Sequence, residues 1–338
     1  MSTAASSPDE RNAQMKAIQC VAFGPLENLV LTDVPDPMAE AGEIVVQVRA
    51  AGVNFPDALM VQGKYQVKPP LPFTPGLECA GVVATVGAGV TGFKPGDRVA
   101  ALPNPGAFAE KVRVPASASF LIPDKITFPA AAAFLLTYGT SWYGLVTRGH
   151  LAAGETLLVL GASGGVGLAA VQIGKLLGAR VIAAASSEEK LDLCTRNGAD
   201  AVIDYSREDL KTRVRELTDG KGADVIFDPV GGDFSEAALR SCAWRGRLLV
   251  IGFAAGAIPK LPANLILLKG CSVIGVLWGE YSVREPDAYR AEMLALIERF
   301  AAGELVPHVS ATYPLARSVD ALNALIGRSA TGKVVIEP

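Results

Sequence analysis

The chain has 338 residues, half of them hydrophobic, and a formal net charge of −3 at pH 7. This length predicts one large or two medium domains, each with its own core. The small net charge without long charged runs argues against nucleic acid or an anionic membrane as a partner. No apolar run reaches the roughly 18 residues that a membrane-spanning helix needs.

Residues 1–14 are polar and carry both charges, without the apolar core of a secretory signal. We expect them to form a disordered extension. The five cysteines are widely spaced, and no pair has the CxxC spacing of a zinc knuckle or redox dithiol. This pattern favours reduced thiols in a cytoplasmic protein.

The next hundred residues predict a compact, partly barrel-like β domain. Short apolar or alternating runs are separated by breaks rich in Gly, Pro, Asn and Asp, as expected for strands and turns. The predicted strands are 17–23, 29–33, 43–51, 79–86 and 98–102.

Beyond residue 124 the pattern changes to helices and buried strands. Helices are expected at 129–136 and 139–148, followed by strands at 156–160, 180–184, 201–204, 224–228, 247–251 and 272–277. The intervening helices are 165–177, 187–197, 209–218, 234–242 and 262–268. This alternation predicts a doubly wound parallel sheet.

The last segment is expected to return to the β-rich domain, with helices at 285–302 and 318–327 and strands at 309–312 and 333–336. The predicted division is therefore a β-rich domain of residues 15–137 and 279–338, with a nucleotide-binding domain of residues 138–278 inserted between its parts.

Residues 157–167 (LLVLGASGGVG) combine a buried strand, a glycine-rich turn and the start of a helix. Glycines let a backbone approach a pyrophosphate, and the first N–H groups of a helix receive its charge. The GxxG spacing is present, although Ala162 stands at the first glycine position of the usual fingerprint. The predicted cofactor residues here are Ser163, Gly164, Gly165, Val166 and Gly167.

The end of the second strand indicates the choice of cofactor. An NAD site has an acidic residue there, whereas this chain has Ser186, with Lys190 shortly after it. A hydroxyl and a cation suit the 2′-phosphate of NADPH, and Glu188 and Glu189 suit the first turn of a helix in any case. The alternative is that Lys190 is an ordinary solvated residue.

Three further residues follow other strands of the same sheet. Tyr205 is placed to stack beside the adenosine phosphate, or else is an aromatic residue at a domain boundary. Gly252 and Phe253 come directly after the fifth strand, at the carboxyl edge where ligands bind in such sheets.

Six motifs, spread along the chain, together resemble those of a known protein family. They are residues 50–57 (AAGVNFPD), 75–81 (PGLECAG), 92–99 (GFKPGDRV), 106–110 (GAFAE), 161–167 (GASGGVG) and 331–335 (TGKVV). In this order they resemble the medium-chain dehydrogenase/reductase superfamily, and within it the quinone oxidoreductase (zeta-crystallin) branch. The resemblance implies a Rossmann doubly wound parallel sheet inserted in a β-rich, GroES-like, partly barrel catalytic domain. It also implies a homodimer, because the strand expected at 272–277 would otherwise be an unprotected apolar edge.

The resemblance also predicts that no metal takes part. Zinc alcohol dehydrogenases carry cysteine where Asn54 stands and histidine where Leu77 stands, and Glu78 alone cannot hold zinc. Without a metal or a histidine relay, alcohol oxidation loses its usual machinery. The remaining chemistry is hydride transfer from NADPH to a quinone or a carbonyl-conjugated alkene.

By the same resemblance, Asn54, Asp57 and Tyr65 lie near the nicotinamide. Asn54 would orient the acceptor or the cofactor amide, Asp57 would act through hydrogen bonds, and Tyr65 would donate a proton or simply pack. The residues expected along the cofactor cleft are Thr140, Leu277 and Trp278, with Arg328 and Lys333 as weaker phosphate candidates.

Two alternatives remain open from the sequence. One is an enoyl-thioester reductase acting on a short acyl-CoA. The other is a non-catalytic NADPH-binding protein like the crystallin or vesicle-protein relatives of this branch, because a cofactor fold does not prove turnover.

Overall fold

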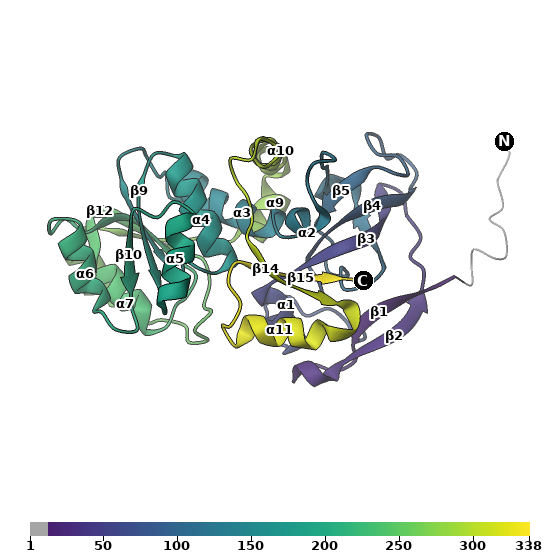
Figure 1. The fold of residues 1–338 in the computed structure, drawn as a ribbon, viewed down its shortest axis with the longest axis horizontal. Helices are drawn as coiled ribbons and strands as arrows, with labels where there is room; N and C mark the ends of the chain where they lie inside the picture. Colours follow the sequence, from purple (N-terminus) through teal and green to yellow (C-terminus); the bar gives the residue numbers. More distant parts are fainter. Residues whose placement is uncertain (1–12) are drawn as a thin grey trace. The chain divides into compact units, whose positions relative to one another are not determined.

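The computed structural model describes residues 13–338, which divide into two compact units (Figure 1). The first unit extends to Leu136 and resumes at Val309, and the second comprises Thr137–His308. The expected N-terminal extension lies outside the described residues up to residue 12, and the first strand already includes Gln14.

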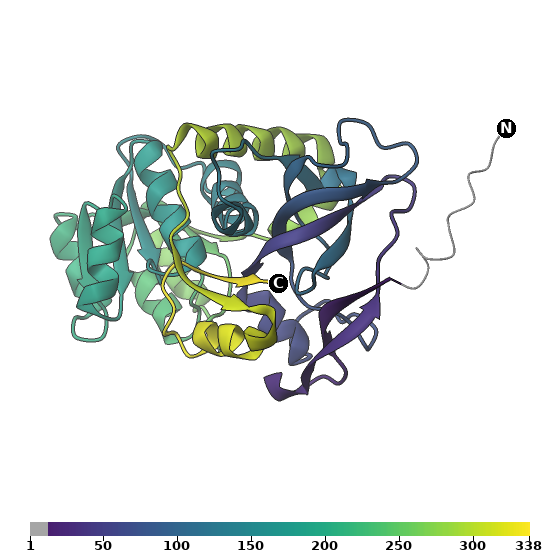
Figure 2. The same cartoon turned by 45° about the vertical axis from the view of Figure 1, so that its right-hand side comes forward.

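The first unit is built on strands. An antiparallel ribbon of β1 (Gln14–Cys20) and β2 (Leu29–Pro35) stands apart from the larger sheet in both Figure 1 and Figure 2. The larger sheet has the order β14-β15-β3-β4-β5-β7, with β6 also pairing with β3. Its strands are β3 (Glu43–Val53), β4 (Glu78–Val86), β5 (Arg98–Ala101), β6 (Lys111–Pro115), β7 (Ser119–Leu121), β14 (Val309–Pro314) and β15 (Lys333–Glu337). The β-rich prediction is confirmed, and the sheet does not close into a barrel within the described residues.

Three helices pack on this unit: α1 (Phe55–Val61), α2 (Phe128–Ala132) and α11 (Ser318–Ile326). α11 lies beside α1 (Figure 1). The sequence interpretation missed α1, although Asn54 at its N-cap, Pro56 in its first turn and Asp57 at its third position are helix-start signals. The core between these elements contains Ile44 and Phe108, both fully buried.

The register of three adjacent strands brings distant residues together. Val53 of β3 pairs with Val334 of β15, and Gly52 pairs with Glu78 of β4. Asn54 therefore lies next to Lys333 on one side and close to Glu78 on the other. This end of the sheet carries the polar cluster described below.

The second unit contains the predicted parallel sheet, in the order β10-β9-β8-β11-β12-β13. The strands are β8 (Thr156–Leu160), β9 (Arg180–Ala185), β10 (Ala201–Asp204), β11 (Ala223–Asp228), β12 (Cys242–Val250) and β13 (Ser272–Gly275). Strand order reverses between β8 and β11, and ligands bind at such a switch point. The doubly wound prediction is confirmed.

The helices of the second unit are α3 (Leu135–Trp142), which begins at the boundary, α4 (Gly165–Leu176), α5 (Glu188–Arg196), α6 (Leu210–Leu217), α7 (Asp233–Arg240) and α8 (Ala263–Lys269). A π-helical segment, Tyr143–Arg148, follows α3, so the single helix expected at 139–148 is in fact two segments. Within residues 13–338, no helix combines the length and apolarity that crossing a membrane requires.

The expected boundary at residue 279 differs from this division. Both α9 (Trp278–Arg284) and α10 (Pro286–Ala302, seen side-on in Figure 2) belong to the second unit. Tyr281 of α9 stacks on Tyr143 with ring centroids 4.3 Å apart, and Thr147 Oγ1 donates a 2.7 Å hydrogen bond to Glu292 of α10. These contacts attach the two helices to the π-helical segment Tyr143–Arg148 of the second unit.

Candidate cofactor and catalytic sites

The turn after β8 has the geometry of an anion site. Gly161 has φ of +56°, which favours glycine, and a Cβ on Gly167 would lie only 2.3 Å from the carbonyl oxygen of Gly161. Gly164 is the N-cap of α4, and no side chain caps this helix. The first-turn N–H groups, including those of Gly165 and Val166, are therefore oriented for a ligand such as a pyrophosphate.

A contact that the sequence did not reveal connects this turn to α3. Ser141 Oγ donates a 2.9 Å hydrogen bond to the carbonyl oxygen of Val166. Thr140, one residue earlier, is half-buried on the same helix. That Thr140 lines the cofactor cleft stays a prediction.

Trp278 also packs on α3. A Cβ on Gly139 would lie 2.4 Å from the indole ring, so only glycine leaves room for it. The ring also lies 5.6 Å from the ring of Tyr289. Leu277 precedes Trp278 at the N-cap of α9 and is 55% exposed, which leaves its side chain available to a ligand. The expected sixth strand is shorter than predicted because it ends at Gly275.

The structure brings together the residues predicted to select the cofactor. Lys190 Nζ lies 3.4 Å from Ser186 Oγ, just beyond the end of β9. In the neighbouring strand, Asp204 pairs with Ala185, so Tyr205 follows at the same edge, where its N–H donates to the carbonyl oxygen of Ala185. The Tyr205 ring rests against Phe234 at 4.7 Å.

The ends of β11 and β12 complete this edge. Asp228 Oδ1 accepts hydrogen bonds from the N–H groups of Val230 and Gly231, each 2.9 Å long, and Asp228 Oδ2 accepts one from Ser235 Oγ. A Cβ on Gly231 would lie 2.8 Å from the ring of Phe253, so the loop containing Gly252 and Phe253 meets the one after β11. Asp228 therefore fixes the conformation of the loop after β11 through these hydrogen bonds. The sequence interpretation did not assign this role.

The first unit contains a buried polar cluster of Asn54, Asp57, Glu78 and Lys333, all 4% exposed or less. Asn54 Nδ2 donates to Glu78 Oε1 at 2.9 Å, and its N–H donates to Asp57 Oδ2 at 2.8 Å. Lys333 Nζ lies 2.6 Å from both Asn54 Oδ1 and Glu78 Oε1. Two predicted catalytic residues thus share one hydrogen-bonded network.

Burial changes the acidity of two of the predicted catalytic residues. It raises the pKa of Asp57 to about 7, although the hydrogen bond from the Asn54 backbone N–H and the nearby Lys333 ammonium both act to lower this pKa. Burial and the nearby Asp57 carboxylate also raise the pKa of the half-buried Tyr65 hydroxyl. Tyr65 therefore carries its proton at neutral pH and can donate it.

The raised pKa of Asp57 predicts a pH dependence of stability. Folded Asp57 holds a proton up to pH of about 7, whereas the unfolded side chain releases it near its usual value of 3.8. The free energy of unfolding therefore falls as pH rises through this window, on the order of 1 kcal/mol per pH unit. Urea denaturation at pH 5, 6 and 7 should show this fall in the wild type and a flatter profile in Asp57→Asn. Parallel profiles would contradict the assignment.

The two weaker phosphate candidates lie in the first unit. Arg328 follows α11 on the surface with φ of +57°. Lys333 is buried, and its three N–H groups are taken by Val53, Asn54 and Glu78. These bonds argue against the prediction that Lys333 binds a cofactor phosphate, because the ammonium has no donor left.

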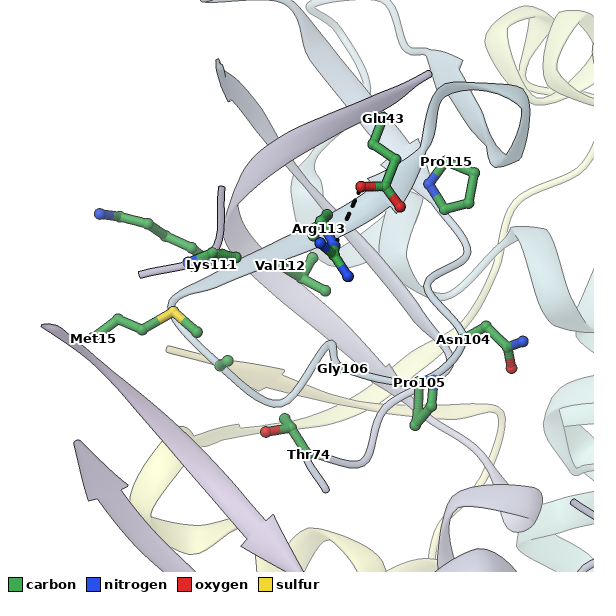
Figure 3. A pocket seen from close by; sticks show the side chains of 12 residues that line it. Met15, Glu43, Thr74, Asn104, Pro105, Gly106, Lys111, Val112, Arg113 and Pro115 are labelled. Carbon is green, nitrogen blue, oxygen red and sulfur yellow. Dashed lines mark ion pairs between the residues drawn. The ribbon is translucent and has the colours of Figure 1, made fainter. Parts of the chain in front are cut away.

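A pocket of about 400 Å³ also lies in the first unit (Figure 3). In its wall, Arg113 and Glu43 point toward each other, with Nε and Oε2 3.2 Å apart. Lys111, another wall residue, pairs with Asp36. The cations of this pocket are thus neutralised, and none of the predicted site residues lines it.

Comparison with known proteins agrees with this architecture. Residues 40–124 match the family model described as "Alcohol dehydrogenase GroES-like domain", and residues 165–299 match "Zinc-binding dehydrogenase". The chain is 43% identical over 297 residues to a quinone oxidoreductase-like protein 2 homolog of Nematostella vectensis, covering 87% of this chain and 81% of the relative. It is 38% identical over 328 residues to a quinone oxidoreductase of Pseudomonas aeruginosa, covering 96% and 99%.

A solved structure of a quinone oxidoreductase has the same fold. The quinone oxidoreductase of Escherichia coli, complexed with NADPH, superposes with a TM-score of 0.89 at 32% identity, covering 96% of this chain and all of that one (100%). Fold and site thus define an oxidoreductase of the alcohol dehydrogenase type. Within that class, the chain belongs to the quinone oxidoreductase branch of the medium-chain dehydrogenase/reductase superfamily.

The description of one family model names zinc, but the residues present do not fit a zinc ion. Asn54 and Leu77 stand where zinc alcohol dehydrogenases have ligands, and Glu78 Oε1 is held by the Lys333 ammonium at 2.6 Å. Among residues 13–338, no group of three or more His, Cys, Asp or Glu side chains is arranged to hold a metal.

Proposed function

We propose that this protein is an NADPH-dependent reductase that transfers hydride to a quinone or a carbonyl-conjugated alkene. The observation that carries the proposal is the pair of Ser186 and Lys190, 3.4 Å apart at a strand end without an acidic residue. A hydroxyl and a cation there favour a 2′-phosphate over a bare ribose.

When bound, NADPH supplies the hydride. The N–H groups of Gly165, Val166 and Gly167 would hold its pyrophosphate, and Ser186 and Lys190 would bind its 2′-phosphate. The side-chain N–H groups of Asn54 are used by Gly52 and Glu78, at 3.2 and 2.9 Å. Asn54 can therefore only accept a further hydrogen bond, which favours orienting the cofactor amide over stabilising an oxyanion.

The acceptor must already be electrophilic. Burial and the nearby Asp57 carboxylate keep the Tyr65 hydroxyl protonated, which supports a role for Tyr65 in giving a proton to a reduced substrate. A quinone needs the least help, because its reduced oxygens can take protons from water. An enoyl thioester is the alternative substrate and would depend more strongly on a proton donor.

The proposal is tested by following NADPH oxidation with three acceptors: a benzoquinone, a simple enone and a short enoyl-CoA ester. We expect turnover with the quinone and slower turnover with the enone. Turnover restricted to the enoyl-CoA ester would favour the thioester reductase, and no turnover with any acceptor would favour a binding protein.

Exchange of Tyr65 for phenylalanine is expected to lower kcat for an enone by about 100-fold, because the general acid is lost. The rate with a benzoquinone should change by much less. Tyr313→Phe is the matched control, since Tyr313 is also half-buried against the core of the first unit. An unchanged enone rate in Tyr65→Phe would make Tyr65 a packing residue.

We also propose that the protein is a homodimer paired through β13. This strand is an edge of its sheet, and strongly exposed apolar side chains lie on the neighbouring strand β12 and on helix α8: Trp244 by 73%, Leu267 by 80% and Leu268 by 73%. Light scattering should give twice the chain mass of 35.1 kDa. Leu267→Lys/Leu268→Lys should shift the mass toward one chain, and a wild-type monomer at micromolar concentration would contradict the proposal.

A further inference from the structure

Lys333 occupies an unusual position for a lysine. It begins β15 in the interior of the first unit, where it is 4% exposed. Its ammonium donates to the carbonyl oxygen of Val53 at 2.9 Å, to Asn54 Oδ1 at 2.6 Å and to Glu78 Oε1 at 2.6 Å. These bonds use all three N–H groups of the ammonium. Lys333 therefore serves this buried cluster and nothing outside it.

Glu78 depends on this ammonium. Its side chain is fully buried, Oε1 accepts from Asn54 and Lys333, and Oε2 accepts from the N–H of Leu136 at 3.0 Å. A buried carboxylate is tolerated when it is paired with an opposite charge and hydrogen-bonded. Glu78 and Lys333 together meet that condition, with no net charge between them.

The same arrangement fixes the amide of Asn54. An ammonium only donates and a carboxylate only accepts, so Asn54 Oδ1 must face Lys333 and Nδ2 must face Glu78. The N–H of Asn54 in turn holds Asp57 Oδ2 at 2.8 Å. The Lys333–Glu78 pair thus sets the orientation of Asn54, and through Asn54 that of Asp57.

By the family resemblance, one side chain of this cluster, Asn54, stands at a ligand position of the zinc enzymes. Zinc alcohol dehydrogenases have a cysteine ligand where Asn54 stands, and the adjacent histidine ligand where Leu77 stands, next to Glu78. Here Asn54 and Glu78 hold the ammonium of Lys333 instead. The positive charge at this position is therefore a lysine side chain of the protein.

We propose that the Lys333 ammonium is the fixed cation around which this site is organised, and that Lys333 is a positioning residue that acts on the reduction through Asn54. The inference rests on the proposed reductase function. It differs from a phosphate-binding role, which would require the ammonium to face the cofactor.

The two roles predict opposite kinetics for Lys333→Met, a neutral exchange of similar length. A positioning residue should lower kcat with a quinone at least tenfold and leave the Kd for NADPH within twofold of the wild type. A phosphate ligand should weaken NADPH binding at least tenfold and leave kcat unchanged. The second result, or no change in either constant, would overturn the proposal. Lys125→Met, at an exposed site of the same unit, is the control.

Action through Asn54 is tested by a double-mutant cycle. Once Asn54→Ala has removed the amide, adding Lys333→Met should lower kcat by less than threefold more, because the two residues act as one unit. Multiplicative losses would mean that Lys333 acts by another route and would overturn the proposal.

If Lys333→Met alone does not fold, a double variant provides the test. In Glu78→Gln/Lys333→Met both charges of the buried ion pair are removed together, and kcat should fall at least tenfold below that of the wild type, because no ammonium then holds Asn54 Oδ1. Equal values would overturn the positioning role. Absence of turnover in the wild type would instead overturn the proposed function, so the two failures are distinguishable.

Discussion

Replacement of Lys190 with alanine is expected to weaken NADPH binding by about 10- to 100-fold and to leave NADH binding unchanged. The factor follows from the roughly 1.5–3 kcal/mol that a hydrogen bond to a charged group contributes. Lys190 is held 3.4 Å from Ser186, directly after a strand that ends in Ala184 and Ala185. NADPH has a 2′-phosphate for this cation to bind, and NADH has a hydroxyl at that position.

Fluorescence titration of both nucleotides with the wild type and the variant measures this difference. Lys221→Ala, at an exposed position of the same unit, should leave both affinities unchanged. Equal affinities for NADPH and NADH in the wild type would refute the assignment of the 2′-phosphate site. A parallel loss for both nucleotides in Lys190→Ala would mean that the lysine binds another part of the cofactor.

The second large effect concerns the buried ion pair. Glu78→Ala leaves the Lys333 ammonium, 4% exposed, without its carboxylate partner 2.6 Å away. Breaking a buried pair on one side costs about 3–5 kcal/mol, because the remaining charge cannot be solvated. The free energy of unfolding of Glu78→Ala should therefore fall by that amount in a denaturant titration.

Glu27→Ala provides the control, since Glu27 is an exposed glutamate of the same unit and its loss should change stability by less than about 0.5 kcal/mol. The double variant Glu78→Ala/Lys333→Met should regain part of the lost stability, because no charge is then left unpaired. Equal stability of Glu78→Ala and the wild type would show that the pair contributes nothing.

The nucleotide-binding sheet could be predicted because its signals are local. The strand at Leu157–Leu160 is continuously apolar and fully buried, and the glycine turn follows at once. Such runs of buried parallel strands separated by helices have few alternative arrangements. The pairing of Lys190 with Ser186 was predictable for the same reason, since Ser186 directly follows β9 and Lys190 lies four residues later in the first turn of α5.

The polar cluster could not be predicted because it depends on strand register. Lys333 and Asn54 are 279 residues apart in the sequence, and Lys333 and Glu78 are 255 apart. Only the pairing of Val334 with Val53 and of Glu78 with Gly52 brings them together. From the sequence alone, a lysine near the end of the chain was therefore interpreted as a phosphate ligand.

The predicted boundary at residue 279 differs from the structure for another reason. Helix α10 has no sequence signal that says which core it joins, and the interpretation assigned it to the β-rich domain. Its actual attachment comes from specific side chains, such as Glu292 bonded to Thr147 and Tyr289 packed on Trp278. Aromatic contacts of this kind are tertiary and leave no periodic pattern.

The most direct test of the account is NADPH oxidation by chelator-treated protein with a benzoquinone as acceptor. We predict one hydroquinone formed for each NADPH consumed, at a rate that added zinc does not raise. Absence of oxidation, or activity that is lost on chelation and restored by zinc, would contradict the proposal that this protein transfers hydride from NADPH without a metal.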